Sequence, residues 1–496
     1  MSVVGSQVDS LDLAVVVSRS ERRKREIQTR LGSDPIFAGT GGRDYRGFLD
    51  AYHGETGLPV AEAAAAARDV AWKEANESEL PPGYGDSRYD KRQPPLLLEL
   101  AADKLFARLS YPADGIAGVR VRPEDVIVCP YSSTILLEEA IATLAEGCPG
   151  GAIVCPEGFY KSAPLHIGKS GLRIETCPTT ADDSFRLDPV ALERVLRRLG
   201  QAGELAGVLL TLPGNPVVAE YSVAELIEIG RVLLDSGTRV ICDMAFDRLV
   251  AHHIPIAAVR VPSERGRVPL FDRILTITGN SKGYNASGPT KIGAACSGDS
   301  VWLKEIRDRL TVVFQRETTH LAAAIIDHTP DGYFETTRRI ALSQQARAWR
   351  RVAAINRRED LTARFGGDAL RPLGSPHGMF LTIAFAPAVL EAAGIEDTPQ
   401  LEDLLLAVAG IDSVALLRTG SHRLGVRLNI LTPRNQFGPP TTVDGRPDER
   451  RAVVLDELFD RIERLLLDIL AGRTYATAIT AKGLAPLSAV SYGGMR

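Results

Sequence analysis

The sequence contains no long apolar run, no surplus of basic charge and no secretion signal. No apolar stretch reaches the roughly 18 residues that a membrane-spanning helix needs. The 58 basic and 62 acidic residues give a net charge of −4, so the composition does not call for a nucleic-acid partner. The N-terminus lacks a basic segment followed by an apolar one, which argues against secretion. We therefore expect a cytoplasmic protein that binds neither membranes nor nucleic acid.

Metal-binding and disulfide patterns are also missing. None of the six cysteines forms a Cys-x-x-Cys pair, and several lie in apolar runs such as 152–155 (AIVC). This favours small buried hydrophobic residues in a reducing compartment over disulfides or zinc ligands. His252 and His253 are adjacent, and adjacent residues seldom point to the same metal ion. We therefore expect a loop or core role for them and no metal. The basic run 21–26 (ERRKRE) is predicted to be a solvated helix face.

What the sequence does contain is a regular alternation of strands and helices. We expect strands at 126–129, 152–155, 172–176, 207–211, 239–242, 274–277 and 292–296. Helices are expected between and after them at 134–146, 189–200, 223–236 and 301–316. Apolar strands that alternate with helices predict an α/β fold with a largely parallel sheet covered on both faces.

The flanking regions predict a second, smaller α+β domain. Helices are expected at 61–77, 96–109, 341–364 and 451–471, and strands at 379–385 and 424–430. The length of 496 residues suits one large domain with a companion. The expected organisation is an N-terminal segment (1–95) serving the small domain and dimer contacts, a large domain (96–330), the small domain (331–472) and a tail (473–496). We expect that small, polar tail to be a flexible arm or a partner-clasping segment.

Polar residues follow three of the expected strands. Asn215 lies in a tight loop, Asp243 comes directly after a buried strand, and Lys282 ends the segment 275–283 (LTITGNSKG). Alone, such residues are usually a turn, a helix cap and a surface lysine. Their order, one strand–helix–strand step apart, favours a common site, because ligands of open α/β sheets bind at the carboxyl ends of the strands.

The chemistry of these side chains suits an aldehyde cofactor. A lysine amine forms an imine with an aldehyde and exchanges it for a substrate amine. An aspartate holds a pyridine nitrogen protonated, which makes the ring an electron sink, and an asparagine amide can donate to a phenolic oxygen. Backbone amides at the helix start after 132–134 (SST), with hydroxyls and a cation near Lys282, suit a phosphate.

Together these segments resemble the class I/II aminotransferases, which are fold type I enzymes that depend on pyridoxal 5'-phosphate (PLP). Asn215-Pro216 is similar to the family's Asn-Pro-Thr-Gly loop, and residues 243–246 (DMAF) to its Asp-x-Ala-Tyr strand end. Ser281-Lys282, followed by Gly288 and 291–293 (KIG), resembles the Ser-Lys…Gly-x-Arg-Ile-Gly segment. Residues 426–428 (VRL) resemble the segment with the arginine that binds the substrate carboxylate.

The resemblance implies roles for individual residues. Lys282 carries PLP as a Schiff base, and Arg427 binds the substrate α-carboxylate. Either Tyr160 or Phe159 stacks on the ring, and a tyrosine from the loop around Tyr84 and Tyr89 reaches the phosphate of a dimer partner. The implied cofactor-binding residues are Ser132, Ser133, Phe159, Tyr160, Asn215, Asp243, Phe246, Thr278, Ser281, Lys291 and Tyr89. A homodimer with sites at the subunit interface is implied as well.

Several positions depart from the family pattern and indicate a divergent member. Phe246 stands where a tyrosine usually bonds the ring oxygen, so the tuning of the imine should depend more on Asn215. Residues 217–219 (VVA) replace the usual Thr-Gly.

The phosphate-binding positions depart too. Lys291 stands near the usual arginine and lacks its bidentate fork. Gly279 stands at a hydroxyl position that Thr278 or Ser281 can replace, and Tyr131 occupies the usual glycine of the phosphate turn.

Three functions remain open on this basis. The first is an aminotransferase that moves an amino group between an amino acid and a 2-oxo acid, with Lys282 moving the Cα proton. The second is a PLP enzyme of specialised biosynthesis that catalyses α,γ-elimination, replacement or carbon–carbon bond formation on S-adenosylmethionine, as in 1-aminocyclopropane-1-carboxylate synthases. Phe246 and the long N-terminus favour it. The third is a binding module without activity, which the intact Asn215, Asp243 and Lys282 disfavour.

Overall fold

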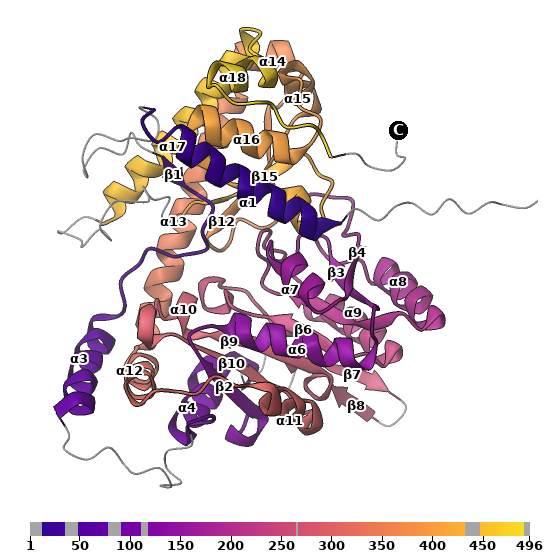
Figure 1. The fold of residues 1–496 in the computed structure, drawn as a ribbon, viewed down its shortest axis with the longest axis vertical. Helices are drawn as coiled ribbons and strands as arrows, with labels where there is room; N and C mark the ends of the chain where they lie inside the picture. The colour runs from indigo at the N-terminus through magenta and orange to yellow at the C-terminus, as the bar shows by residue number, and fades with distance from the viewer. Residues whose placement is uncertain are drawn as a thin grey trace, which may run out of the picture. The chain divides into compact units, whose positions relative to one another are not determined.

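A computed structural model describes residues 12–34, 48–77, 91–110, 118–263, 266–431 and 447–490. The chain forms two compact units, labelled by element in Figure 1. The large unit comprises Gly54–Ala346 and Leu373–Phe380, and the small unit comprises Met1–His53, Arg347–Pro372 and Leu381–Arg496. Each unit has its own hydrophobic core.

A seven-stranded mixed sheet forms the centre of the large unit. Its strand order is β2-β10-β9-β6-β5-β3-β4, and β10 runs antiparallel to both neighbours while the other pairs are parallel. The strands are β2 (Val126–Pro130), β3 (Ala152–Pro156), β4 (Arg173–Cys177), β5 (Leu205–Thr211), β6 (Val240–Asp243), β9 (Ile274–Gly279) and β10 (Ile292–Cys296). The predicted α/β fold and all seven predicted strands are confirmed.

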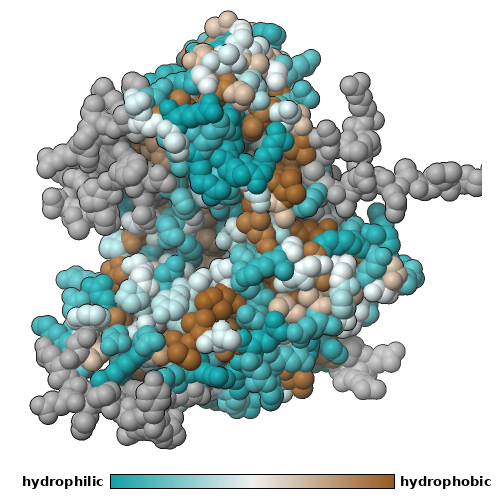
Figure 2. All heavy atoms as spheres, in the orientation of Figure 1, coloured by the Kyte–Doolittle hydropathy of each residue, from teal (hydrophilic) through white to brown (hydrophobic). Residues whose placement is uncertain are grey.

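Helices pack around this sheet. They are α3 (Glu62–Glu77), α4 (Pro95–Leu100), the π-helix η2 (Ala101–Leu105), α5 (Ala107–Ser110), α6 (Ser133–Gly147), α7 (Ala163–Lys169), α8 (Pro189–Ala202), α9 (Val223–Ser236), α10 (Asn280–Gly283), α11 (Ser300–Arg309) and α12 (Arg316–Asp327). Helix α13 (Asp331–Asn356) begins in the large unit and ends in the small unit, whose core contains its Ala348, Val352 and Ile355. A hairpin of β7 (Arg260–Ser263) and β8 (Gly266–Pro269) was not expected from the sequence. Figure 2 shows a mainly polar surface with smaller apolar patches.

Local chemistry sets where these helices begin and end. Ser222 and Glu225 form a capping box at the start of α9, and Gly237 ends that helix in the left-handed conformation, at φ +67°. The predicted helix 301–316 is wrong at its end, because α11 stops at Arg309 and a separate helix begins at Arg316. The β-branched residues in the intervening 311–313 (TVV) disfavour helix.

The small unit contains a four-stranded sheet of order β11-β12-β15-β14 and a parallel pair of β1 and β13. The elements are α1 (Leu13–Arg30), β1 (Leu49–Asp50), α14 (Glu359–Phe365), β11 (Leu370–Leu373), β12 (Phe380–Phe385), α15 (Pro387–Ala393), α16 (Thr398–Ala409), β13 (Ile411–Asp412), β14 (Val414–Ala415), β15 (Gly425–Asn429), α17 (Pro447–Leu470) and α18 (Tyr475–Ala481). The α+β character of this region matches the expectation for its sequence.

Two expectations about the chain ends need correction. Helix α3 belongs to the large unit, where Ala64 is fully buried in the core, although we assigned residues 1–95 to the small domain. The tail was expected to be an arm, yet its residues form α18, and Tyr475 and Ile479 are buried in the small-unit core. Ala478 and Leu484 are buried there as well, so this part of the tail is anchored in the core.

The basic run in α1 is a solvated face only in part: Arg22 and Arg25 are exposed, but the two residues between them are buried. Arg23 and Lys24 are only 7% and 5% exposed. Arg23 Nε lies 2.7 Å from Asp403 Oδ1, and Lys24 Nζ lies 2.9 Å from Glu402 Oε1. The prediction failed because the acidic partners lie on α16, far away in the sequence.

Five of the six cysteines are buried thiols, as predicted, and Cys148 is partly exposed. Burial raises the pKa of Cys129 and Cys242 to about 12, which makes both poor nucleophiles. Burial also lowers the pKa of His253 to about 3, in keeping with the core role expected for it. In the described ranges, no His, Cys, Asp and Glu side chains gather into a group able to hold a metal ion. No helix in that part of the chain combines the length and apolar character of a membrane span.

Candidate active site

The segments that carry Asn215, Asp243 and Lys282 leave neighbouring strands of the large-unit sheet. Strand β6 lies between β5 and β9, with Asp243 opposite Thr211 on one side and Ile277 on the other. The backbone continues this pairing, since Leu212 N donates to Asp243 O at 3.0 Å. All three residues therefore follow the carboxyl ends of adjacent parallel strands, where ligands of such sheets bind.

Lys282 lies on the short helix α10, directly after β9. The neighbouring Asn280 is fully buried, and its amide donates to Thr290 O at 2.8 Å and accepts from Ile292 N at 2.9 Å. These two bonds fix the lysine segment to the residues before β10. Lys282 Nζ lies 3.3 Å from Glu55 Oε1, and its side chain is 19% exposed. The lysine is therefore held in place at its backbone while its amine remains reachable.

Asp243 ends β6 as a partly buried carboxylate. Its Oδ1 accepts a hydrogen bond from Ala245 N at 3.1 Å. Burial raises the pKa of Asp243 to about 6, and the Ala245 N–H and the positive charge of Lys282 act in the opposite direction. A carboxylate in this environment is stabilised by a cationic group beside it. This fits the protonated pyridine nitrogen of PLP.

The start of α6 lies against the end of the loop before β10. Ser132 Oγ caps α6 by accepting from Thr134 N at 3.2 Å, and Tyr131 N donates to Lys291 O at 2.9 Å. A Cβ on Gly293 would lie 2.5 Å from Ser133 Cα, so glycine is required for this close approach. A helix N-terminus beside a lysine suits a phosphate.

The departures from the family pattern in this turn are visible in the backbone. Tyr131 adopts φ +72°, the left-handed conformation that glycine favours, and its side chain is 46% exposed. The side chains of Ser132, Ser133 and Lys291 are partly exposed. A tyrosine thus holds the conformation of the glycine it replaces.

The two hydroxyls suggested as replacements at Gly279 differ in accessibility. Thr278 is 2% exposed, and its hydroxyl donates to Met244 O at 3.4 Å. Ser281 is partly exposed on α10. A Cβ on Gly279 would lie 2.5 Å from Ile292 O, which explains why no side chain occurs there. Of the two hydroxyls, Ser281 is the one open to a ligand.

The two candidate stacking residues have different surroundings. Phe159 is 1% exposed in the core, whereas Tyr160 is partly exposed, with its ring stacked at 6.4 Å on that of His166. Asn215 is 5% exposed and precedes a cis Asn215–Pro216 peptide bond. Phe159 and Tyr160 both follow the end of strand β3 (Ala152–Pro156).

Sequence reasoning missed the residues around Gly54. A Cβ on Gly54 would lie 3.4 Å from Phe246 Cζ, 3.5 Å from Phe380 Cζ and 4.0 Å from Lys282 Nζ. The Phe246 and Phe380 rings meet edge to face at 5.1 Å. Phe246 therefore packs in an apolar pair near the lysine, and Gly54 keeps the space in front of them clear.

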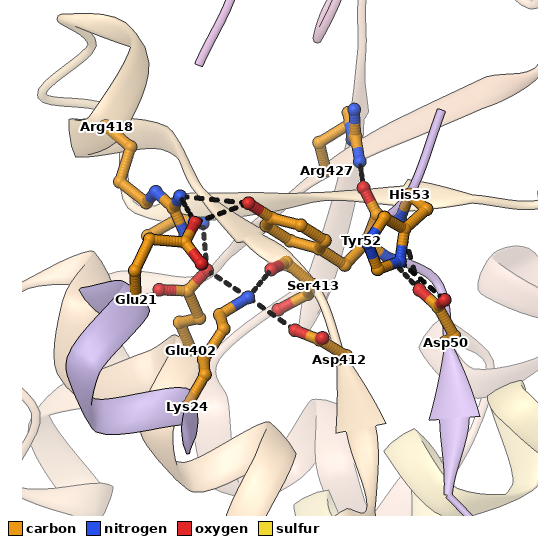
Figure 3. Close-up of polar contacts among 11 residues, drawn as sticks. Glu21, Lys24, Asp50, Tyr52, His53, Glu402, Asp412, Ser413, Arg418 and Arg427 are labelled. Atoms are coloured by element: carbon orange, nitrogen blue, oxygen red, sulfur yellow. Dashed lines mark hydrogen bonds and ion pairs between the residues drawn. The ribbon is translucent and has the colours of Figure 1, made fainter. Parts of the chain in front are cut away.

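Arg427 lies on β15 in the small unit, within the polar cluster of Figure 3. It is 1% exposed, and its guanidinium donates to Tyr52 O. The Tyr52 hydroxyl donates to Glu21 and accepts from Arg418. Burial lowers the pKa of Arg427 to about 10, so the guanidinium remains positively charged at neutral pH.

The Tyr52 backbone is held from several sides. Asp50 Oδ1 accepts from Tyr52 N and His53 N at 3.1 Å, and Asn429 Nδ2 donates to His53 O at 2.8 Å. Arg427 is thus fixed against an ordered turn. Tyr84 and Tyr89 lie outside the described residues.

Comparisons with known proteins agree on the family. The family described as aminotransferase class I and II matches residues 51–416. A probable aspartate/prephenate aminotransferase of Thermus aquaticus is 24% identical over 289 residues, 56% of this chain and 66% of the relative. A bifunctional aspartate and glutamate/aspartate-prephenate aminotransferase of Petunia hybrida is 24% identical over 172 residues, 34% of this chain and 33% of the relative. The matched segments span less than two thirds of either relative.

Solved structures share the fold. A double mutant of Thermus thermophilus aspartate aminotransferase superposes with a TM-score of 0.65 at 15% identity, covering 90% of this chain and 96% of the other. N-Succinyldiaminopimelate aminotransferase from Mycobacterium tuberculosis gives 0.63 at 19% identity, covering 91% and 97%. The chain belongs to the class I and II aminotransferases, a family of PLP-dependent enzymes with fold type I.

Proposed function

We propose that this protein is an aminotransferase that exchanges an amino group between an amino acid and a 2-oxo acid, with Lys282 as the residue that binds PLP covalently. The observation that carries the proposal is the placement of Lys282 and Asp243 after adjacent strands β9 and β6. Burial raises the pKa of Asp243 to about 6, and a cationic group beside this carboxylate, such as the ring nitrogen of PLP, would favour its ionised form.

When bound, PLP supplies the electron sink that makes the substrate Cα–H acidic. In the proposed mechanism Asp243 keeps the ring nitrogen protonated, and Asn215 donates to the phenolic oxygen. With PLP bound, the Lys282 amine would be the group that takes up the proton from the substrate Cα and later donates it back. Arg427 binds the substrate α-carboxylate and orients the Cα–H bond.

The other candidate residues would hold the cofactor. Ser132, Ser133, Ser281 and Lys291 bind the phosphate together with the N-terminus of α6, and Thr278 supports this region from within the sheet. Phe159 or Tyr160 stacks on the ring, and Phe246 packs at its edge without donating a hydrogen bond. Tyr89 would reach the cofactor phosphate of a second copy of the chain in a homodimer. Light scattering of the purified protein tests whether that homodimer forms. The buried free thiols suit a reducing cytoplasm.

A second candidate keeps the cofactor and changes the reaction. Phe246 removes the hydroxyl that the family usually places beside the ring oxygen, and this favours elimination, replacement or carbon–carbon bond formation on S-adenosylmethionine. Such an enzyme cleaves the bond between sulfur and the γ-carbon of S-adenosylmethionine. It does not transfer the substrate's amino group to a 2-oxo acid.

A single-turnover experiment separates these functions. The purified holoenzyme is mixed with a panel of amino acids and no acceptor, and the 2-oxo acid released and the cofactor's visible absorbance are measured. An aminotransferase releases one 2-oxo acid per site and retains the amino group, whereas the alternative releases a thioether from S-adenosylmethionine. Lys282→Ala should lose the absorbance of covalently bound PLP, while Lys169→Ala, an exposed control on α7, should keep it. Equal absorbance in both variants would refute the role of Lys282.

A further inference from the structure

A tyrosine links the proposed carboxylate-binding arginine to the N-terminal helix. The Arg427 guanidinium donates to the backbone oxygen of Tyr52, and the hydroxyl of the same tyrosine donates to Glu21 of α1 (Figure 3). Arg418 contacts both groups, since its Nη2 donates to the Tyr52 hydroxyl at 3.2 Å and also to Glu21. All of these residues belong to the small unit, so the link lies within one compact body.

The Tyr52 side chain is held by charged groups. Lys24 Nζ lies 3.9 Å from the centre of its ring, and the Arg418 guanidinium lies 5.3 Å from the same centre. Tyr52 and Arg418 are 7% and 0% exposed. Hydrogen bonds to charged groups are strong, and burial strengthens them further because water does not compete for the donors. The tyrosine ring is therefore fixed by α1 and by Arg418.

A side chain that is fixed at its hydroxyl also restricts its own backbone. Tyr52 N donates to Asp50 Oδ1 at 3.1 Å, and Tyr52 O accepts from Arg427. A guanidinium binds a carboxylate through two parallel hydrogen bonds only when its plane is correctly oriented. A shift of the Tyr52 oxygen would turn that plane and weaken the binding of a carboxylate.

From these contacts we infer that Tyr52 and Glu21 are positioning residues for Arg427, so that α1 sets the orientation in which this arginine binds the substrate α-carboxylate. The inference rests on the proposed function, because it takes Arg427 as the carboxylate-binding group. Tyr52 and Glu21 act through Arg427 and need no contact with the substrate. The N-terminal helix thereby takes part in substrate binding.

The test uses two reagents that differ in a carboxylate. Aminooxyacetate and methoxyamine carry the same aminooxy group, whose nitrogen takes the place of the Lys282 nitrogen on PLP and releases the lysine amine. Only aminooxyacetate offers Arg427 a carboxylate. Both second-order rate constants are measured on the holoenzyme from the loss of the absorbance of covalently bound PLP. The ratio of the rate constant for aminooxyacetate to that for methoxyamine reports how well the carboxylate is bound, whichever amino acid the enzyme uses.

Three variants change the link without removing Arg427. Tyr52→Phe keeps the ring and removes the hydroxyl, and it should lower the ratio by about 5-fold, within the range of coupling between residues that share a hydrogen-bond network. Glu21→Ala should lower the ratio as well. Glu21→Gln still accepts hydrogen bonds, so it should recover part of this loss.

Tyr475→Phe is the matched control for Tyr52→Phe. The Tyr475 hydroxyl is also a donor to a buried carboxylate, because it lies 2.8 Å from Asp403 Oδ2 where α18 packs on α16. Both substitutions should lower the urea concentration at the midpoint of unfolding. Only Tyr52→Phe should lower the ratio of rate constants. An unchanged ratio in Tyr52→Phe, or an equal fall in Tyr475→Phe, would overturn the inference, since the network would then be structural only.

Arg427→Lys separates the failure of this inference from that of the proposed function. If Arg427→Lys lowers the ratio and Tyr52→Phe does not, Arg427 keeps its carboxylate role and the positioning is refuted. If neither variant changes the ratio, both are refuted. If the ratio depends on Tyr52 but no amino acid releases a 2-oxo acid, transamination is refuted and the positioning stands.

Discussion

Replacing Lys24 by methionine should destabilise the small unit strongly, although this residue lies in a run of charges typical of a helix surface. Lys24 is 5% exposed, and its Nζ lies 2.9 Å from Glu402 Oε1 and 2.6 Å from Ser413 O, with Asp412 in contact. Both carboxylates have side chains only 4% exposed. Methionine matches the stem of lysine and removes only the charge and its hydrogen bonds.

The magnitude follows from what remains after the substitution. Arg418 stays 3.2 Å from Glu402, whereas Asp412 loses the cation that it contacts. Loss of one partner from a buried ion cluster costs about 3–5 kcal/mol, because the remaining charges stay desolvated. The charges of Lys24 and Arg418 lower the pKa of Glu402, whereas burial raises the pKa of Asp412. The cluster therefore favours the ionised form of Glu402 more than that of Asp412.

Urea unfolding measures this cost. Tryptophan fluorescence is a suitable probe, since Trp349 packs against the small-unit core. Lys482→Met is the matched control: it removes an ion pair with Asp34 at 2.7 Å whose side chains are about one fifth exposed, and it should cost at most about 1 kcal/mol. Adding Asp412→Asn to Lys24→Met should recover part of the loss. If Lys24→Met costs no more than the control, the cluster is not desolvated and the reasoning is wrong.

Three further predictions concern the candidate site. Because burial raises the pKa of Asp243 from 3.8 to about 6, the apoprotein should lose stability as pH rises between about 4 and 6. Melting curves of the apoprotein measure this loss, and Asp243→Asn should abolish it. Stability that does not fall over this range would show that Asp243 is solvated. Gly293→Ala places a Cβ 2.5 Å from Ser133 Cα, so it should cost about 1–3 kcal/mol and weaken PLP retention on dialysis, and unchanged retention would contradict the phosphate role of this turn. Arg427→Lys should raise KM for amino acids by about 10–100-fold with a smaller change in kcat, because lysine lacks the bidentate fork. An unaltered KM would exclude Arg427 as the residue that binds the substrate carboxylate.

The sheet and the sequence positions of its polar ends were predictable because they depend on local patterns. Short β-branched runs between amphipathic helices located β5, β6 and β9, and the ends of these strands located the polar residues after them. The antiparallel direction of β10 was not predictable from its sequence, IGAAC, because a short buried strand looks the same in either direction. The break between α11 and α12 was missed because apolar spacing continues across it.

Contacts between distant segments were beyond reach for a different reason. Charge pattern alone placed Arg23 and Lys24 on the surface, and only the fold brings α16 and its carboxylates to them. The backbone of Tyr131 could not be foreseen either, since tyrosine seldom adopts a positive φ and nothing in its neighbours requires it.

Glu55 shows why contacts from outside the sheet are harder to predict than the residues that follow its strands. Residues that handle the shared chemistry, such as Asp243 and Lys282, follow strands, and their spacing is set by the repeating units of the sheet. Glu55 precedes the sheet and lies 227 positions from Lys282 in the chain, with no periodic pattern connecting them. The contact between Glu55 and Lys282 therefore depends on tertiary packing alone.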